Sequence, residues 1–155
     1  MTDTEFYERQ AVVAEAMTWL GTPFHHHQAV KGAGVDCALF LYSVYRGVGL
    51  IPEIKIEDYS PQWHLHKDEE RYMNWVLQFA ARVENATFKP GDGALFRFGR
   101  AASHGVIIVE WPQIIHAYSK SRMVTLDNAL DNPSLALDRA GKSRREGIFR
   151  LKQWA

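Results

Sequence analysis

The chain has 155 residues, with 18 basic and 18 acidic side chains, so its formal net charge is zero. This balance argues against nucleic acid as the main partner, because phosphate binding relies on a positive surface. Hydrophobic residues make up 46% of the chain and charged residues 23%. This is the composition of a soluble globular protein, and the length suits one domain spanning residues 1–155.

The N-terminus is acidic and polar from Met1 to Glu5. It lacks the basic start and apolar stretch of a signal peptide, and no apolar run approaches the roughly 20 residues that span a bilayer. We therefore expect a protein made in the cytoplasm without a signal peptide and with no membrane partner.

The first predicted helix covers residues 4–20 and begins at Asp3 or Thr4 as its cap. Its apolar residues recur at helical spacing, which predicts one buried face. That face is expected to hold Phe6, Val13, Met17 and Leu20, with Val12, Ala16 and Trp19 beside it.

Two further helices are predicted in the first half. One begins at or just before Cys37, after the glycine-bearing loop 21–36, and the other runs from Asp68 to about Arg82. Their expected buried residues are Phe40, Leu41, Val44, Tyr45 and Val48 in the former, and Tyr72, Trp75, Val76 and Phe79 in the latter.

After the turn "KPGDG" at residues 89–93 the apolar period changes from helical to strand-like. A short helix is expected around Leu135–Arg139 and an edge strand at Ile148–Leu151. The remaining short strands are predicted at Ala94–Phe98, Gly105–Val109, Ile114–Tyr118 and Met123–Leu126. Helices first and an antiparallel sheet second indicate an α+β domain.

Cys37 is the only cysteine, so it forms no intramolecular disulfide. A helix N-terminus offers unpaired backbone N–H groups and a positive dipole end. We therefore expect a lowered pKa for this thiol and donors for an oxyanion beside it. The competing interpretation is a small buried hydrophobic residue.

Two histidines favour the reactive interpretation. A cysteine nucleophile needs a base, and the base needs an orienting partner. His104 in "SHGVIIVE" and His116 in "IIHAYS" lie on successive predicted strands, which can place both rings on one face. His104 would pair with the sulfur, and His116 would hold the ring of His104.

Three blocks of the sequence resemble the NlpC-type cell-wall cysteine peptidases, above all the branch found in phage tails and gene-transfer agents. The blocks are "GTPFHHHQAVKGAGVDCALF", "KPGDGALFRFGRAASHGVIIVE" and "IIHAYSKSRMV". The resemblance implies a circularly permuted papain-like fold with N-terminal helices on a small antiparallel sheet. It also implies hydrolysis of peptidoglycan stem peptides, typically between γ-D-glutamate and diaminopimelate, with Cys37 as nucleophile, His104 as base and His116 as the orienting residue.

The chain departs from this family at several positions. Phe24 stands where the family usually has a tyrosine, and we hypothesise that His26 substitutes for its hydroxyl. Ala38 and Leu39 replace the usual serine and glycine, whereas Asp36, which helps to hold the stem peptide in relatives, is kept. The predicted substrate contacts are therefore Asp36, His26, Phe24, the loop residue Trp63, and Ser103 before the base.

No metal or other cofactor is expected, because thiol catalysis of this kind needs none. A histidine site formed by residues 25–27 with His64 and His66 is the competing metal interpretation. The expected partners are a peptidoglycan stem peptide and phage tail proteins, with action at the cell wall as part of a phage or phage-like tail. The alternatives are a catalytically silent tail protein with the same fold and an acyltransferase of the same superfamily.

Overall fold

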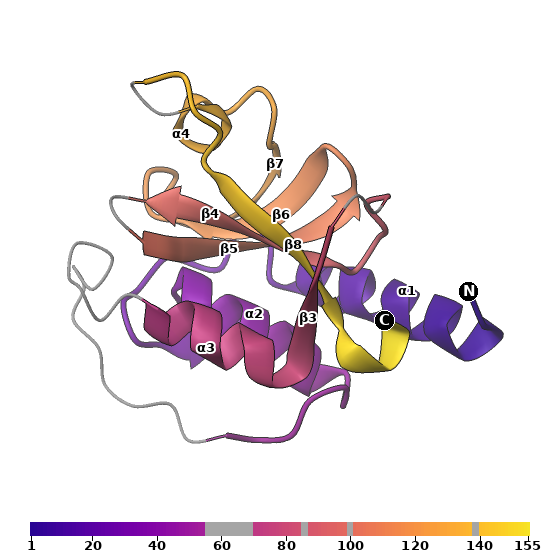
Figure 1. Cartoon of the computed structure of the whole chain (residues 1–155). Coiled ribbons are helices and arrows are strands. Elements are labelled where there is room, and N and C mark those ends of the chain that lie inside the picture. Colours follow the sequence, from indigo (N-terminus) through magenta and orange to yellow (C-terminus); the bar gives the residue numbers. More distant parts are fainter. Residues whose placement is uncertain (55–69, 85–86, 99–100, 138–139) are drawn as a thin grey trace.

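The computed structural model describes residues 1–54, 70–84, 87–98, 101–137 and 140–155 of the chain, and the side chains of 70–72 and 101–103 lie outside this description. Three helices lie against one side of an antiparallel sheet, and a short fourth helix lies on the opposite side (Figure 1). The expected α+β class is thereby confirmed. The helices are α1 (Asp3–Thr18), α2 (Cys37–Gly47), α3 (Glu70–Phe79) and α4 (Pro133–Ala136).

The described strands form one large sheet and one small one. The large sheet has the order β3-β8-β4-β5-β6-β7, and all of its pairs are antiparallel. The strands are β1 (Ala29–Val30), β2 (Gly34–Val35), β3 (Ala80–Val83), β4 (Gly93–Phe98), β5 (Ala101–Glu110), β6 (Gln113–Tyr118), β7 (Met123–Asn128) and β8 (Arg145–Leu151). The pair β1–β2 was not predicted from the loop that precedes Cys37.

Helix α1 lies close to its predicted position but presents a different face. Its N-cap is Thr2, whose hydroxyl accepts the Glu5 N–H. Phe6 is 49% exposed and Leu20 42%, so the prediction is wrong for the centre of the buried face, whereas the residues expected beside it are buried. The face that is buried holds Arg9, Val12, Ala16 and Trp19.

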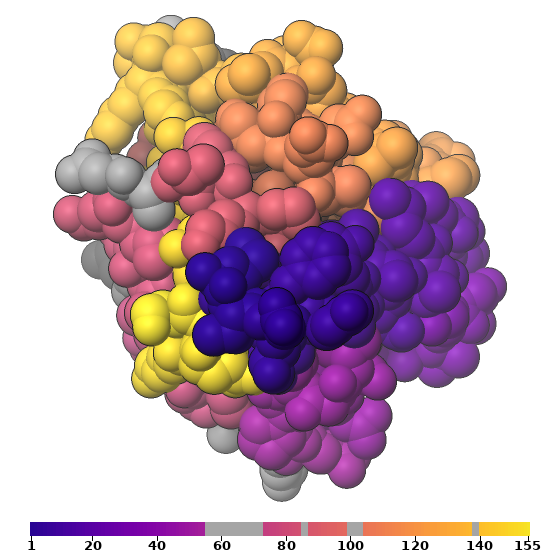
Figure 2. All heavy atoms as spheres, turned by 90° about the vertical axis from the view of Figure 1, so that its right-hand side faces the viewer, coloured from indigo at the N-terminus to yellow at the C-terminus, as the bar shows by residue number. Residues whose placement is uncertain are grey.

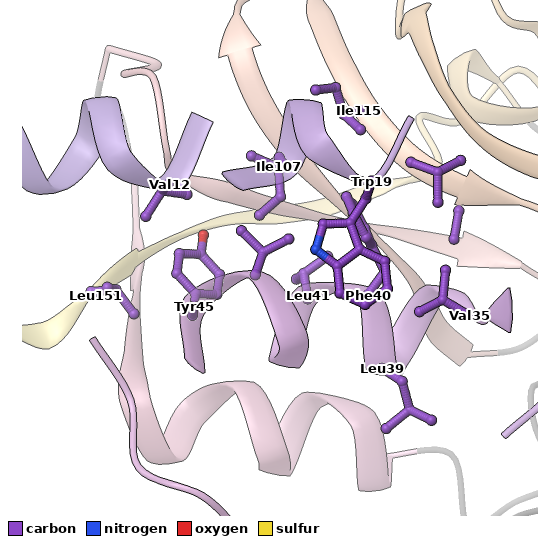
Figure 3. Close-up of a cluster of buried hydrophobic side chains, with 14 of the residues drawn as sticks. Val12, Trp19, Val35, Leu39, Phe40, Leu41, Tyr45, Ile107, Ile115 and Leu151 are labelled. Atoms are coloured by element: carbon purple, nitrogen blue, oxygen red, sulfur yellow. The ribbon is translucent and has the colours of Figure 1, made fainter. Parts of the chain in front are cut away.

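Helix α2 begins at Cys37, as predicted, and packs its apolar stripe between α1 and the sheet (Figure 3). Phe40 is fully buried and meets Trp19 edge to face, with ring centroids 6.2 Å apart. Ile107 of β5 and Ile115 of β6 complete this core. Because buried side chains in a protein core are closely packed, these contacts fix the start of α2 against the middle of the sheet.

The third helix ends earlier than predicted. Residues from Ala80 to Val83 leave α3 and form β3, which pairs with β8. Strand β8 therefore lies between β3 and β4 instead of at the sheet edge, which contradicts the expected edge position of Ile148–Leu151. The predicted cap Asp68 and the side chain of Tyr72 lie outside the described residues.

The two ends of the chain meet on one face of the molecule, where α1 lies beside the C-terminal turn Lys152–Trp154 (Figure 2). The Trp154 indole N–H donates to Glu8 at 2.6 Å, and the Arg9 guanidinium lies 4.3 Å from the Trp154 ring centroid. Arg9 and Arg150 both bind the buried carboxylate of Asp92. This contact ties α1 to the turn that opens the sheet.

No helix within the described ranges is both long enough and apolar enough to cross a membrane.

Candidate active site

Asp36 and Cys37 form the start of α2. The Asp36 backbone is extended, with φ −106° and ψ 177°, and its side chain caps the helix. Its Oδ1 accepts the Leu39 N–H at 3.0 Å, and its Oδ2 accepts the His27 N–H at 2.7 Å. The buried carboxylate thus joins the preceding loop to the helix and holds Cys37, whose side chain is half-buried, at the first turn.

The sulfur of Cys37 lies at the junction of α2 and β5. Backbone N–H groups of Ala38, Cys37 and Gly105 interact with it and lower its pKa. Burial and the neighbouring Asp36 charge outweigh them, so the pKa of the thiol is raised. The expectation of a lowered pKa is therefore wrong, because it counted the helix terminus and omitted desolvation. At neutral pH the resting form is the thiol.

The sheet brings His104 and His116 into direct contact. His104 Nε2 lies 2.7 Å from His116 Nδ1, and both side chains are buried. His104 stacks on Phe98 with centroids 4.5 Å apart, and His116 stacks on Tyr118 with centroids 4.6 Å apart. These rings hold the two imidazoles in fixed planes. His104 also adjoins Gly105, whose N–H reaches the Cys37 sulfur.

Both imidazoles are neutral at pH 7. Burial lowers the pKa of His116 to about 4, although the nearby Asp127 carboxylate opposes this shift. Burial and the neighbouring His116 hold the pKa of His104 well below its ordinary value. The site therefore rests as an uncharged thiol beside two uncharged rings.

Asp127 extends this line of polar groups, and the sequence pattern did not point to it. Its Oδ2 lies 3.0 Å from His116 Nε2 and accepts the Asn132 side-chain N–H at 2.7 Å. The hairpin register could have revealed it. His116 lies opposite Thr125, so Asp127, two residues further along β7, is its diagonal neighbour on the same face.

The predicted substrate contacts fall in different places. Phe24 is half-buried and packs against the main core. His26 Nδ1 lies 3.9 Å from Asp36 Oδ2, which places His26 on the loop before the nucleophile candidate. Trp63 lies outside the described residues, as does the side chain of Ser103.

Ala38, which replaces the serine usual in the resembling family, lines an apolar pocket between α2, α3 and the sheet. Trp75 of α3 and Phe149 of β8 also line this pocket. Hydrocarbon therefore surrounds the position where a polar contact with substrate would be expected.

Among the residues that the structure places, no three His, Cys, Asp or Glu side chains gather as a metal site would require. His64 and His66, which the metal interpretation includes, lie outside the described residues.

Solved structures provide the comparison that identifies the fold. NlpC1 from Trichomonas vaginalis aligns with a TM-score of 0.61 and 17% identity over 93% of this chain and 44% of that chain. The NlpC/p60 domain of the peptidoglycan hydrolase SagA aligns with a TM-score of 0.60 and 18% identity over 92% of this chain and 98% of that chain. The peptidoglycan hydrolase RipB from Mycobacterium tuberculosis aligns with a TM-score of 0.59 and 16% identity over 97% of this chain and 68% of that chain.

Sequence comparisons found no match: no protein-family model matches the chain, and no curated protein matches it significantly. The shared architecture is therefore established by structure. The chain has the fold of the NlpC/P60 domains, with helices packed on a small antiparallel sheet.

Proposed function

We propose that the protein is a cysteine endopeptidase that hydrolyses amide bonds in peptidoglycan stem peptides. The observation that carries this proposal is the contact between His104 of β5 and His116 of β6, whose ring nitrogens lie 2.7 Å apart, next to Gly105 of β5, whose N–H reaches the Cys37 sulfur. A thiol, a base and an orienting group in this order are the parts that nucleophilic acyl transfer needs. The fold shared with the peptidoglycan hydrolases SagA and RipB supports the substrate class.

Acylation begins with proton transfer from the Cys37 thiol to His104 as the sulfur attacks the peptide carbonyl carbon. Backbone N–H groups at the start of α2, including that of Cys37, donate to the oxyanion. His104 then passes its proton to the leaving amine, the C–N bond breaks, and a thioester remains on Cys37. Water, deprotonated by His104, attacks the thioester, and the proton returns to the sulfur as the acid leaves.

The raised pKa of Cys37 makes base assistance necessary in this scheme. Thiolate is scarce at neutral pH, so the sulfur loses its proton during attack instead of before it. A neutral His104, with its pKa lowered, is in the correct form to receive that proton.

The scissile bond proposed is the one between γ-D-glutamate and diaminopimelate. The resemblance of "GVDCALF" and "SHGVIIVE" to NlpC-type peptidases supports it. The buried Asp36 carboxylate is occupied by two backbone N–H groups, so its contribution to substrate binding would act through the loop that it holds. We propose His26, on that loop, as the group nearest to the role of the missing tyrosine hydroxyl.

We place this activity in a phage or phage-like tail, where it would open the wall locally. The residue resemblance to tail-associated members supports this setting. Assembly with tail proteins would then deliver the enzyme to its substrate.

The test is digestion of a defined muropeptide that carries L-alanyl-γ-D-glutamyl-diaminopimelate, with the products read by mass spectrometry. We expect two products separated at the γ-D-glutamyl bond from the wild-type protein and none from Cys37→Ala. Circular dichroism and thermal unfolding of Cys37→Ala serve as the folding control. Cleavage by Cys37→Ala at the wild-type rate would exclude the thiol mechanism.

A catalytically silent tail protein is the second candidate function, favoured by the raised pKa of Cys37 and by the hydrocarbon around Ala38. It predicts intact muropeptide with both proteins. An acyltransferase would instead give a product joined to an added amine or hydroxyl compound, which the same mass spectra would show.

A further inference from the structure

We propose that Asp127, oriented by Asn132, is a positioning residue that fixes which nitrogen of His116 and of His104 carries the proton. The inference rests on the proposed function for its importance to catalysis. Its structural content, the direction of each hydrogen bond, rests only on contacts among described residues.

The direction of the hydrogen bonds in this chain of side chains is determined first at Asn132. Its Oδ1 accepts the Ser134 backbone N–H at 2.9 Å, and a backbone N–H can only donate. The side-chain amide is therefore oriented with its NH₂ group toward Asp127, and Nδ2 donates to Asp127 Oδ2 at 2.7 Å. An amide whose orientation rests on a backbone donor has one assignment.

The Asp127 carboxylate determines the direction of the next hydrogen bond, the one to His116. Its Oδ1 accepts the Asn128 backbone N–H at 2.8 Å. Its Oδ2 accepts from Asn132 and faces His116 Nε2 at 3.0 Å. An ionised carboxylate only accepts, so His116 Nε2 must carry a hydrogen.

The two imidazoles complete the chain. Neutral His116, with its proton on Nε2, has a lone pair on Nδ1, which accepts from His104 Nε2–H over 2.7 Å. Neutral His104 then has its lone pair on Nδ1. That nitrogen is the one able to take the thiol proton of Cys37 in the proposed mechanism. When His104 becomes positive, the negative charge of Asp127 at the far end of the chain stabilises it.

Asp127→Asn is the sharpest variant because it keeps the shape and changes only donors and acceptors. If the new NH₂ group faces His116, it donates to Nε2 and moves the His116 proton to Nδ1. The Asn132 NH₂ group, which donates to this position in the wild type, then has to turn away. His104 Nε2 must then accept, and its own proton moves to Nδ1. If the NH₂ group faces Asn128 instead, it opposes a backbone donor of β7, which cannot turn away as the Asn132 side chain can, so this orientation is less favourable. Asp131→Asn, at an exposed position four residues along, is the matched control.

The experiment measures histidine tautomers by ¹⁵N NMR, the alkylation rate of Cys37 by iodoacetamide at pH 7, and muropeptide turnover. We expect both His104 and His116 as Nε2–H tautomers in the wild type and in Asp131→Asn. In Asp127→Asn we expect a shift toward Nδ1–H, with turnover and alkylation falling about 100-fold or more, the scale of general-base assistance.

An Nδ1–H tautomer on either ring of the wild-type protein would overturn the inference, and this result needs no folded variant. Unchanged tautomers and turnover in Asp127→Asn would overturn it as well. If the wild type shows the expected tautomers and the shift in the variant but leaves muropeptide intact, the positioning role stands and the proposed function falls.

Discussion

Two buried polar groups, one around Asp92 and the other around His104, show how differently a fold can use ionisable side chains. Asp92 accepts from Arg9, twice from Arg150 and from the Lys89 N–H, with distances of 2.8 to 3.2 Å. These four donors match the four lone-pair positions of a carboxylate. In the other group, His104 uses Nε2 to meet His116 and has Nδ1 as its second ring nitrogen.

The difference separates a structural polar cluster from a reactive one. The Asp92 carboxylate joins three elements, namely α1, β8 and the turn before β4, and all four of its acceptor positions are occupied. The chain Asp127–His116–His104 is anchored at one end by backbone N–H groups and ends at the other in a nitrogen of defined protonation. A buried polar cluster is therefore not by itself evidence of a reactive site. A buried cluster in which one group can still exchange a proton is such evidence.

Of the changes that test this comparison, Asp92→Asn is expected to cause the largest loss of stability. Removing the negative charge leaves Arg150 without the carboxylate that it binds, and it leaves Arg9 with Glu5 as its remaining carboxylate partner. Breaking a buried ion pair in this way typically costs about 3–5 kcal/mol. Urea unfolding of wild type and variant at pH 7 measures this loss. The control is Glu53→Gln, which removes an exposed partner of Arg46 and should cost at most about 1 kcal/mol. Equal losses in the two variants would contradict the structural role assigned to the cluster.

A smaller effect is expected from pH, and it should act on the histidine chain. The pKa of His116 is lowered to about 4 in the folded protein, so between about pH 6.5 and pH 4 the unfolded chain binds more protons at this residue. Stability therefore decreases as the pH falls through this window, by about 3 kcal/mol from His116 when the whole window is crossed. His104 acts in the same direction, because its pKa is lowered as well.

Urea unfolding at pH 7 and pH 4.5 measures this dependence, with His116→Asn as the comparison. The variant has lost one of the titrating rings, so its stability should fall less between the two pH values than that of the wild type. An identical fall in both proteins would show that His116 is not the neutral buried group described above.

The fold was predictable where the apolar period is strong and local. The stripe of α2 and the strands from β4 to β7 follow directly from helical and alternating patterns. Helix α1 has two competing apolar stripes, and Arg9 decides between them through Asp92 and Trp154. Both partners are more than 80 positions away, so no local pattern contains that choice. The same holds for β8, because its place between β3 and β4 depends on long-range pairing.

One contact of the candidate site was predictable from the sequence, whereas the electrostatics of the site were not. Strand order and alternation were enough to expect the contact between His104 and His116. The raised pKa of Cys37 could not be predicted in this way. The helix terminus lowers the pKa by a local effect, whereas desolvation depends on everything that is packed around the sulfur. Predicting the contact of Asp127 with His116 required the register of the hairpin, which could have been derived from the turn at residues 119–122.

The central claim is that the sulfur of Cys37 bonds covalently to the substrate. Acid quenching of the protein during muropeptide turnover, followed by intact mass and peptide mapping, tests it most directly. We predict a mass increase equal to the acyl part of the stem peptide, located at Cys37 and lost when turnover is complete. Cleavage that proceeds without an adduct, and equally in Cys37→Ala, would contradict the mechanism.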